Sequence, residues 1–492
     1  MIAILHDMIG PLLRRSRRLW GLAASLAGAG TLLAACHLLD VSNPDIVPPG
    51  GLNNAAALPT IRAGAIGDLH IAYSGSGAQG SGGTTEGVIL LGGMLADELI
   101  NTETFPDRIL ADARQPQRES VTLTNVFRNV HRARRSAEAA AGKFRQYSPD
   151  TTIDAGLAEM LSLAGYAYVF LAENYCSGVP VSTVNADGTF TYGDPLTTAQ
   201  VLDTSLNRFR QALAAAFALD TVKALATGGQ SLLASIRASR ANMINLARVG
   251  IARVLLDAGN AAAADTAVTA VATSFAYQIQ HDLNTTRQNN GVFNGIRKFK
   301  RYGVPDVEGR VGLAWRTVAD VRTPSFRTPA TNFGFDGATP QYDQNRYVDE
   351  KAATPLASGL EARLINAEAA LLRKDTTTYL ATLNALRATP PSYVLSGTAA
   401  LAAITPALTS PADSTAAVTQ LFTERGRWLW LTGHRLSDLR RLERQYARPD
   451  SLVFPHGGYF KSGLQYGSAT SYPIPLDEEN NPKAAICLST AP

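Results

Sequence analysis

The sequence predicts a mainly α-helical fold, in which helical hairpins form a scaffold that long irregular loops interrupt. Apolar residues recur at spacings of three and four in seven segments between residues 153 and 441. Short breaks at Gly259–Asn260, Lys374–Asp375 and Gly433 join several of these segments, as in antiparallel helix pairs. The chain has 492 residues, of which 46% are hydrophobic and 17% charged, enough for a large core. This composition excludes a disordered, collagen-like or coiled-coil chain, and three cysteines exclude a disulfide-rich scaffold.

The first 35 residues have the pattern of an export signal. Four arginines between positions 14 and 18 precede an uncharged stretch, residues 19–35, that is rich in Gly and Ala. A single membrane-spanning helix needs about 20 strongly apolar residues, so this stretch of 17 residues favours a secretory signal over an N-terminal anchor. Ser16-Arg17-Arg18 also offers a weak twin-arginine signal, which leaves both the Sec and Tat export routes open.

The end of this stretch, Leu33-Ala34-Ala35-Cys36, resembles the lipobox of bacterial lipoproteins. The resemblance implies removal of residues 1–35 and attachment of acyl chains such as palmitate to Cys36, which would hold the protein on a membrane. Residues 36–51, with their prolines and glycines, are expected to form a short tether. Removal of the signal takes four of 45 basic and one of 41 acidic residues, so 41 basic and 40 acidic residues remain. The mature chain therefore gives no general electrostatic reason to expect nucleic acid as a partner.

The helical segments are expected over the following ranges: 153–175, 199–219, 239–257, 261–276, 360–373, 379–388 and 419–441. Their many alanines allow close approach of neighbouring helices. The pattern is typical of tetratricopeptide-like stacking, although no strict repeat of 34 residues is visible.

Helical periodicity fails in three long stretches, residues 73–87, 280–358 and 389–411, where Gly, Pro, Asn, Asp and Thr are common. Long loops within a helical scaffold usually carry function or are disordered. Residues 52–492 are therefore interpreted as one helical domain whose ligand region lies at about 280–358.

Four stretches resemble the SusD/RagB family, the surface lipoproteins that work with TonB-dependent outer-membrane transporters in nutrient uptake. The first stretch is Cys36 followed by Leu39–Pro44, and the second is the helix pair within 360–387. The third runs from Glu424-Arg425-Gly426-Arg427-Trp428 through Gly433–Arg441 to Tyr472-Pro473-Ile474-Pro475 and Asn481-Pro482. The fourth and weakest is Tyr192–Thr198 after Val179-Pro180. The resemblance spans nearly the whole mature chain, and the C-terminal motif is its most specific part.

The resemblance implies a SusD-like fold and a non-catalytic lipoprotein on the outer membrane at the cell surface. Such a protein would bind a nutrient, an oligosaccharide or a peptide, and deliver it to a SusC-like TonB-dependent transporter. The alternative is a helical-repeat scaffold lipoprotein that binds another envelope protein and no nutrient. A surface hydrolase is disfavoured because no catalytic motif is present.

Residues of the C-terminal motif are interpreted as structural. Glu424, Trp428 and Arg435 are spaced to share one face of a helix or of a helix pair broken at Gly433, so Glu424, Arg435 and Asp438 are expected to pair beneath Trp428. Pro473 and Pro475 cannot continue a helix and predict an extended terminal strap across the scaffold.

No metal or cofactor is expected. None of the seven histidines has a second one at metal-binding spacing, and there is no HExxH, CxxC or phosphate-binding loop. The GxGxxG match at 75–80 is rejected because the loop continues where a helix should begin. Arg297–Tyr302 interleaves basic and aromatic residues, which fits a solvated loop or, less simply, a patch for an acidic ligand or for the transporter. Whether Cys176 and Cys487, 311 residues apart, form a disulfide stays open.

A protein that captures glycans needs exposed aromatic faces and hydrogen-bonding side chains. Trp315 is the one tryptophan of the mature chain within a long loop, because Trp428 and Trp430 belong to the C-terminal motif. Two groups of candidate ligand-binding residues follow from loop position and residue type: Trp315, Arg316, Asp320, Gln341 and Tyr342, and second, Asn101, Phe105 and Asp107. Trp315 as a buried cap on the scaffold is the alternative.

Overall fold

The computed structural model describes residues 49–78, 84–185, 187–397 and 400–491. The expected signal, Cys36 and residues 36–48 of the expected tether lie outside these described residues. The chain divides into two units, Met1–Asn54 and Ala55–Pro492. The description below concerns the second unit.

The α-helices are α2 (Leu58–Ser74), α3 (Val88–Leu95), α4 (Pro106–Asp112), α5 (Val121–Tyr147), α6 (Gly156–Asn174), α7 (Thr198–Phe217), α8 (Thr221–Asp257), α9 (Ala261–Val268), α10 (Gly291–Phe293), α11 (Gly359–Leu372), α12 (Thr376–Ala388), α13 (Ser414–Trp428) and α14 (Arg435–Tyr446). The short strands are β1 (Ile100–Asn101), β2 (Val179–Pro180), β3 (Thr183–Val184), β4 (Phe190–Thr191), β5 (Pro195–Leu196), β6 (Ala276–Ile279), β7 (Tyr302–Gly303), β8 (Ser325–Phe326), β9 (Asp343–Gln344) and β10 (Thr354–Ser358). Single helical turns are η2 (Pro49–Leu52), η3 (Ala55–Ala57), η5 (Thr286–Gln288), η6 (Asn294–Lys298), η7 (Glu308–Arg310), η8 (Asp450–Leu452) and η9 (Leu476–Asn480).

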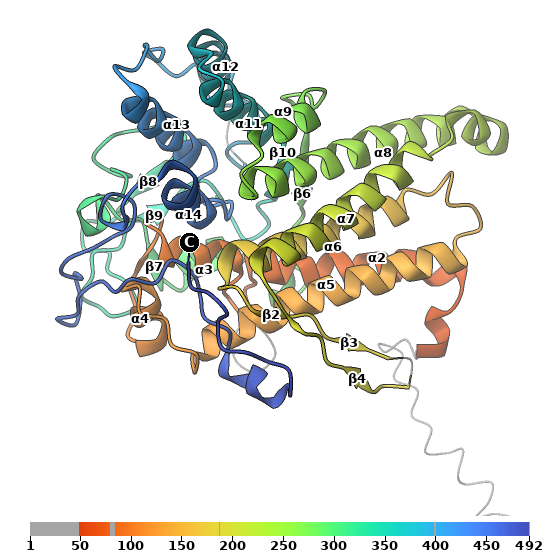
Figure 1. Ribbon diagram of the computed structural model, residues 1–492, viewed down its shortest axis with the longest axis horizontal. Coiled ribbons are helices and arrows are strands. Elements are labelled where there is room, and N and C mark those ends of the chain that lie inside the picture. Colours follow the sequence, from red (N-terminus) through yellow and green to blue (C-terminus); the bar gives the residue numbers. More distant parts are fainter. Residues whose placement is uncertain (1–48, 79–83, 186, 398–399, 492) are drawn as a thin grey trace, which may run out of the picture. The chain divides into compact units, whose positions relative to one another are not determined.

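Eight of these helices pack in one continuous series, α2, α5, α6, α7, α8, α9, α11 and α12, each against the next (Figure 1). In α6 nearly every residue is buried, because α5 and α7 cover its sides and α8 also contacts it. A helix that is apolar around its circumference needs such complete cover. The prediction of a mainly helical fold with tetratricopeptide-like stacking is confirmed.

Two glycines allow α6, α7 and α8 to approach closely. The ring of Phe209, on α7, is fully buried and lies against Gly165 of α6 and Gly250 of α8. A Cβ atom at Gly165 would lie 2.8 Å from the Phe209 ring, and one at Gly250 would overlap it. The same ring meets Tyr166 edge to face, with centroids 4.9 Å apart. Small residues on two helices thus create the space that one aromatic side chain fills.

Most predicted helices are found, with ends fixed by capping side chains. Thr197 and Gln200 form a reciprocal capping box at the start of α7, and Asp375 caps α12. The prediction of a helix over 261–276 is too long: α9 ends at Val268, and Ala276–Ile279 is strand β6, which pairs with β10. Here the backbone hydrogen bonds go to a neighbouring strand, which local periodicity does not reveal.

The segment predicted as one helix or a broken pair, residues 419–441, is a pair. Helix α13 ends at Trp428 and α14 begins at Arg435. The turn between them contains Leu431 and Gly433, both with positive φ, at 54° and 71°. Tyr347 donates a hydrogen bond to the carbonyl of Leu431 at 2.9 Å, which holds the left-handed residue in place.

The C-terminal segment is the extended strap that Pro473 and Pro475 predict. Tyr472 lies beside Tyr175 in a parallel bridge, and its backbone N–H and C=O bond Asn174 and Cys176, each at 2.8 Å. Arg118 donates to the carbonyl of Ile474 at 3.0 Å.

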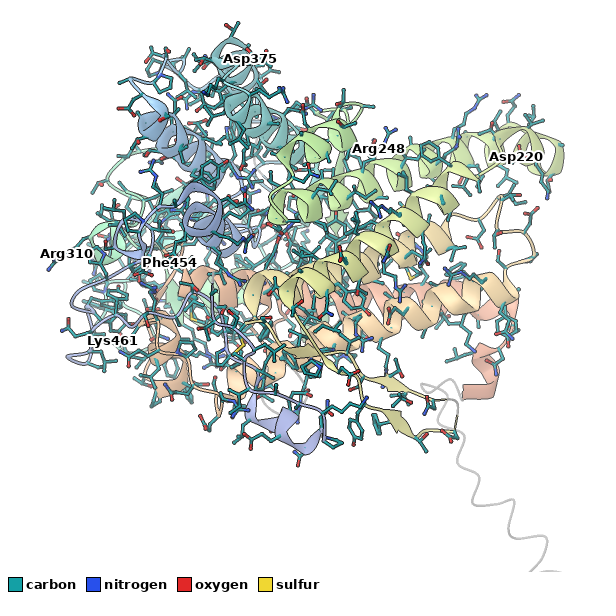
Figure 2. The ribbon with its side chains drawn as sticks, viewed as in Figure 1. Asp220, Arg248, Arg310, Asp375, Phe454 and Lys461 are labelled. Atoms are coloured by element: carbon teal, nitrogen blue, oxygen red, sulfur yellow. A yellow bond between two sulfur atoms is a disulfide. The ribbon has the colours of Figure 1, made fainter. Side chains whose placement is uncertain are left out.

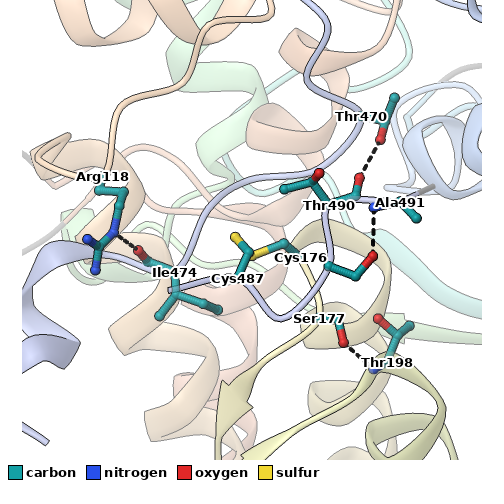
Figure 3. The surroundings of a disulfide bond; sticks show 10 residues. Arg118, Cys176, Ser177, Thr198, Thr470, Ile474, Cys487, Thr490 and Ala491 are labelled. Carbon is teal, nitrogen blue, oxygen red and sulfur yellow. Dashed lines mark hydrogen bonds between the residues drawn. A yellow bond between two sulfur atoms is a disulfide. The ribbon is translucent and has the colours of Figure 1, made fainter. Parts of the chain in front are cut away.

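Cys176 and Cys487 form a disulfide that ties the strap to the end of α6, with Cα atoms 5.6 Å apart (Figure 3). Whether these two cysteines are bonded was left open by the sequence, and in the structure they are.

A search of the described helices finds none with the length and apolar character needed to cross a membrane.

Candidate functional site

The loop region brings together the two groups of predicted ligand-binding residues. Strands β1 and β7 pair antiparallel, with Asn101 opposite Tyr302. Val304, two residues after Tyr302, donates its N–H to the carbonyl of Tyr342 at 2.9 Å. Residues near 101 and residues near 342 therefore lie on either side of one short strand, although the sequence separates them by more than 200 positions.

A turn at residues 332–341 closes over β1. The N–H of Gly334 bonds the carbonyl of Thr339 at 2.9 Å, and the N–H of Gln341 bonds the carbonyl of Asn332 at 3.0 Å. The N–H of Asp336 bonds the carbonyl of Thr102 at 3.0 Å. A side chain at Gly334 would collide with Thr102, so the turn and β1 can meet only because position 334 has no Cβ.

Four side chains on this region form what we call the aromatic–arginine cluster: Arg316, Arg327, Phe333 and Tyr342. The guanidinium carbon of Arg316 lies 3.7 Å from the centroid of the Tyr342 ring. That of Arg327 lies 5.3 Å from the Phe333 ring and 5.8 Å from the Tyr342 ring. Phe333 is exposed, and the other three side chains are partly exposed. The cluster therefore presents stacked cationic and aromatic groups to solvent.

The guanidinium groups of this cluster bind carbonyl oxygens rather than carboxylates. Arg316 donates through Nε to the carbonyl of Pro305, and Arg327 through Nε to the carbonyl of Asn332, both at 3.1 Å. Among the described residues, neither arginine forms an ion pair within 4 Å. Their outer N–H groups are thus available to a ligand.

Two further exposed rings belong to the loop region, Phe335 beside the cluster in the chain and Phe105 beyond β1. Phe335 is 57% exposed, and its N–H bonds the carbonyl of Lys300 at 2.8 Å. Phe105, one of the predicted residues, is 48% exposed at the start of α4, with the guanidinium of Arg108 5.3 Å from its ring. Both could pack against an apolar ligand face.

Trp315 is not a surface residue, and the structure places it as the buried cap that the sequence left as the alternative. Its side chain is 1% exposed and stacks on Trp430 with centroids 6.2 Å apart. Its Nε1–H donates to the carbonyl of Asp97 at 2.5 Å. With both faces and the polar edge occupied, the ring has no face to offer a sugar.

Four other predicted residues hold the loops in place. Asp320 forms an ion pair with Arg322 at 2.7 Å, and the fully buried Gln341 donates from Nε2 to the carbonyl of Tyr302 at 2.9 Å. Asn101 is fully buried, and its N–H donates to Asp112 Oδ2 at 2.7 Å. Asp107 Oδ2 accepts from the hydroxyls of Ser120 and Thr122 at the start of α5, at 3.0 and 2.9 Å. Of the eight predicted positions, Arg316, Tyr342 and Phe105 present side chains to solvent in a way that fits ligand contact.

The prediction that Glu424, Arg435 and Asp438 pair with one another is wrong, because each binds other residues. Glu424 binds Arg322 and Arg387, at 2.6 and 2.8 Å. Arg435 binds Asp97 through Nε at 2.5 Å and Nη2 at 2.8 Å. Asp438 binds Arg425 and Arg441, at 2.9 and 2.8 Å. The turn between α13 and α14 rotates the three residues away from one another, so each finds a partner on another element.

Arg327 and Phe333 were not among the predicted residues. Both lie in the expected ligand region, residues 280–358, but nothing near them in the sequence distinguishes them from the other arginines and phenylalanines there. The pairing of β8 with β9 brings Arg327 beside Tyr342, and the turn at 332–341 brings Phe333 to them. No local pattern in the sequence indicates either contact.

The acidic groups Asp306 and Asp343 near the cluster accept hydrogen bonds from other groups of the protein. Asp306 accepts the backbone N–H groups of Arg316 and Thr317, at 3.0 and 3.2 Å. Burial would raise the pKa of Asp306, but these N–H groups and the charge of Arg316 outweigh it, and the pKa is lowered. Burial raises the pKa of Asp343 above its ordinary value, against hydrogen bonds from Gln341 and the charge of Arg297.

Lys461, from the C-terminal part of the chain, also contributes to this region. Figure 2 shows it on the loop-rich side of the unit, far from Asp220 at the start of α8. Its Nζ pairs with Asp336 at 2.7 Å. Burial alone would raise the pKa of Asp336, but Lys461 and the hydrogen bonds from Thr339 lower it to about 2. This pair fixes the turn beside the cluster.

Two grooves elsewhere on the molecule are weaker candidates for a glycan site. One, of about 780 Å³, lies along α9, α11 and α12 and is lined by threonines and by Asp265, Arg363 and Asn366, without an aromatic ring. The other, of about 470 Å³, contains Phe275 and Tyr277, but Phe275 is buried and the hydroxyl of Tyr277 is bound to Glu159 at 2.8 Å. Neither offers an exposed ring with free hydrogen-bond donors. Within the part of the chain that the structure describes, no three His, Cys, Asp or Glu side chains gather in a way that could hold a metal ion.

The geometry of the aromatic–arginine cluster suits recognition by stacking and by charge-assisted hydrogen bonds. A sugar ring packs its apolar face on an aromatic side chain, and a guanidinium donates two parallel N–H groups to a planar acceptor. No described side chain in the cluster is placed as a nucleophile beside a base.

Comparison with solved structures gives the fold. The surface glycan-binding protein A from Bacteroides thetaiotaomicron, in complex with laminarihexaose, matches with a TM-score of 0.60 at 11% identity, over 88% of this chain and 99% of that one. A SusD-like carbohydrate-binding protein from Bacteroides vulgatus matches with a TM-score of 0.53 at 14% identity, over 89% and 94% of the two chains. A SusD/RagB family protein from Bacteroides thetaiotaomicron matches with a TM-score of 0.58 at 13% identity, over 87% and 94%.

No family model matches the sequence, and no curated protein matches it. The chain thus has the fold of SusD superfamily proteins, as the sequence resemblance predicted, over most of its length and at low identity.

Proposed function

We propose that this protein is a SusD/RagB-type lipoprotein that binds an oligosaccharide at the cell surface without catalysing a reaction. The observation that carries the proposal is the aromatic–arginine cluster, which displays aromatic rings and unpaired guanidinium groups on a scaffold with the SusD-superfamily fold. One protein of that fold is a glycan-binding protein whose structure contains laminarihexaose. A peptide is the second ligand class that the sequence resemblance allows.

Binding of a sugar at the cluster requires no large rearrangement. The rings of Phe333 and Phe335 are exposed, and the polar atoms that shape the turn at 332–341 are bonded to one another. A site that is already formed loses little conformational entropy when the ligand binds. Oligosaccharides often bind to such shallow surfaces, where several weak contacts act together.

Delivery to a SusC-like TonB-dependent transporter completes the proposal. It is supported by the resemblance of the C-terminal motif, residues 424–441, to the family that works with these transporters. Co-purification of the transporter with a tagged form of the protein, from the native membrane, would test this step.

Membrane attachment through Cys36 is the third element of the proposal and rests on the lipobox pattern at 33–36. We expect Cys36→Ala to move the protein from the membrane fraction to the soluble fraction and to abolish labelling with radioactive palmitate. Membrane attachment that persists in the variant would contradict the lipid anchor, and it would leave glycan binding untouched.

Affinity electrophoresis in gels that contain single polysaccharides tests the binding function. We expect retardation of the wild-type protein by at least one polysaccharide, and loss of that retardation in the double variant Phe333→Ala/Phe335→Ala. Phe217→Ala, which removes an exposed ring on α7, is the matched control and should migrate as wild type does. Release of reducing sugar during incubation would contradict a non-catalytic role.

The alternative function, a scaffold for another envelope protein, predicts the opposite pattern. No glycan or peptide would retard the protein, yet a membrane protein would still co-purify with it. The exposed rings on the cluster favour glycan binding over this alternative.

A further inference from the structure

We infer that the oligosaccharide is acidic and that a uronic-acid carboxylate is the group that Arg316 and Arg327 recognise. This inference rests on the proposed function and specifies its ligand class. It follows from the difference between these two arginines and three arginines nearby, Arg108, Arg297 and Arg322.

The other arginines near the cluster have carboxylate partners or are enclosed by rings and carbonyls. Arg108 pairs with Glu103 at 2.8 Å and with Glu86 at 3.2 Å, and Arg322 pairs with Asp320 at 2.7 Å. Arg297 lies between the rings of Phe293 and Phe326, 5.1 Å from each, and donates to Asn345 and Val348. Their charge is compensated, or their donors are used, within the protein.

Arg316 and Arg327 differ because each uses its Nε for a backbone carbonyl and stacks its plane on a ring. This arrangement leaves the outer edge of the guanidinium free. A planar guanidinium held by stacking is oriented in advance, and its two outer N–H groups match the two oxygens of a carboxylate. A neutral sugar would use these donors only for single hydroxyl bonds and would add no negative charge beside the two guanidinium groups.

The surrounding charges do not cancel this positive potential. Lys300 adds a third cation, with its Nζ 2.6 Å from Asn332 Oδ1 rather than on a carboxylate. Asp336 is neutralised by Lys461. Asp343 is buried and bonded to Gln341 and Asn332. Asp306 carries a negative charge beside Arg316, which lowers its pKa against the effect of burial, and it also accepts two backbone N–H groups. The three cations Arg316, Arg327 and Lys300 outnumber it.

The segment Arg297–Tyr302, whose alternation of basic and aromatic residues suggested a patch for an acidic ligand, leads directly into β7 beside the cluster. Arg301 stacks on Phe299, with its guanidinium carbon 5.3 Å from the ring, and it pairs with Glu86 and Glu103 at 3.9 and 3.7 Å. Its charge is therefore compensated within the protein, and recognition of a carboxylate is assigned to Arg316 and Arg327 alone.

The test compares one polysaccharide backbone with and without its charge. Polygalacturonate and alginate carry free carboxylates, whereas fully methyl-esterified polygalacturonate has the same backbone with no charge, and laminarin is neutral. We expect binding to at least one carboxylated polymer, at least tenfold stronger than to the esterified polymer, and falling as NaCl is raised from 50 to 500 mM, since charged contacts are screened by salt.

Two variants locate the effect. Arg327→Gln and Arg316→Gln should each weaken binding of the carboxylated polymer by about tenfold, as expected when a charge-assisted hydrogen bond is lost. Binding of the esterified polymer should fall much less, because a neutral sugar uses these donors only for single hydroxyl bonds. Arg128→Gln, which removes an exposed arginine on α5 that pairs with Asp477, is the control and should bind as wild type does. Thermal unfolding of each variant would show that it is folded.

Equal affinity for the charged and esterified polymers, or binding of laminarin alone, would overturn the acidic-ligand inference and leave the glycan-binding function standing. Retardation by a sulfated polymer with none by the carboxylated ones would also overturn it. Failure of every polysaccharide to bind would refute both proposals.

Discussion

Arginine has two different roles in the two main regions of this molecule. In the helical region around α13 and α14, arginines are buried and bound to carboxylates, as in Arg425–Asp438 and Arg435–Asp97. In the loop region, Arg316 and Arg327 are partly exposed and stack on aromatic rings without a carboxylate partner. The same side chain therefore holds elements together in one region and offers charge to solvent in the other.

The difference follows from burial. A buried guanidinium loses its hydration and must recover that energy from a well-placed carboxylate, which fixes the packing register of the helices. A guanidinium stacked at the surface keeps part of its hydration and can exchange water for a ligand. Substitutions in the helical region should therefore lower the stability of the protein, whereas substitutions in the cluster should lower only ligand affinity.

The largest expected effect is the loss of one partner in a buried pair. Asp97→Ala leaves the charge of Arg435 buried without its carboxylate and also removes the acceptor of the N–H of Leu313, 2.7 Å away. We expect unfolding in urea to show a loss of about 3–5 kcal/mol in the free energy of unfolding. Arg128→Ala, which breaks an exposed pair with Asp477, should cost about 1 kcal/mol or less. Similar losses of unfolding free energy in the two variants would show that buried and exposed arginine pairs do not differ in their contribution to stability.

Removal of the disulfide ranks next. Cys176→Ala/Cys487→Ala releases the strap from α6 and frees a loop that spans 311 residues in the sequence. Because a cross-link mainly restricts the unfolded chain, we expect a loss of about 2–4 kcal/mol. Calorimetric melting with and without a reducing agent measures it. A reducing agent that leaves the melting temperature of the wild-type protein unchanged would show that the strap is held without the bond.

Tight packing of the helical region predicts opposite effects for two helical glycines. Gly250→Val would press against the ring of Phe209 and should destabilise the protein by about 1–3 kcal/mol. Gly142→Ala, on α5, meets no atom within 4 Å and should stabilise it by about 0.5–1 kcal/mol, because alanine favours the helix. Denaturant unfolding of both variants tests this contrast, which a loss of stability at Gly142 would contradict.

A buried pair of carboxyl groups beneath β1 predicts a pH dependence. Asp112 and Glu308 are buried, and Asp112 accepts from the hydroxyl of Tyr459 and the N–H of Asn101, at 2.6 and 2.7 Å. Burial raises the pKa of Asp112 and that of Glu308, whose pKa the charge of Asp112 raises further. A carboxyl pKa that is higher in the folded state favours folding most below its unfolded pKa of about 4, and this contribution is lost as the pH rises.

Asp112→Asn keeps both acceptor bonds through its amide oxygen and removes one of the two carboxyl groups whose pKa is raised. We expect the free energy of unfolding of the variant to fall less than that of wild type between pH 4 and 8. Parallel stability curves for the two proteins over that range would show that titration of Asp112 does not contribute to stability.

The smallest expected effect on stability is at Phe335, the exposed ring beside the cluster. Phe335→Ala removes a ring that is already 57% exposed, so the free energy of unfolding should change by about 0.5 kcal/mol or less. Glycan affinity should nevertheless fall, because the ring is a stacking surface in the proposed site. A large loss of stability with unchanged binding would assign Phe335 to the scaffold rather than to the site.

Local patterns were enough to predict most of the helical region. The helices α6, α7, α11 and α12 lie close to their predicted ranges, because apolar periodicity and capping residues act within a few positions. Helix α5 was missed although its apolar stripe is clear in the structure, since its many arginines interrupt the hydrophobic pattern. The helix predicted over 261–276 extended beyond the end of α9 as far as the first residue of β6, whose partner, β10, is about 80 residues away.

The site could be predicted only in part, because burial depends on distant contacts. Trp315 looked like the best surface aromatic, yet its stack on Trp430 and its bond to Asp97 place it in the core. Arg316 and Tyr342 were predicted and do meet, at 3.7 Å. Arg327 and Phe333 join them through the pairing of β8 with β9 and through the turn at 332–341, and no local pattern in the sequence indicates either.

A crystal structure of the protein with a bound oligosaccharide, chosen as the best binder from the polysaccharide panel, would locate the ligand. We expect a sugar ring against Phe333 or Phe335 and an acidic group within about 3.2 Å of the outer nitrogens of Arg316 or Arg327. A sugar bound in the groove along α9, α11 and α12, with none at the aromatic–arginine cluster, would refute the proposed site.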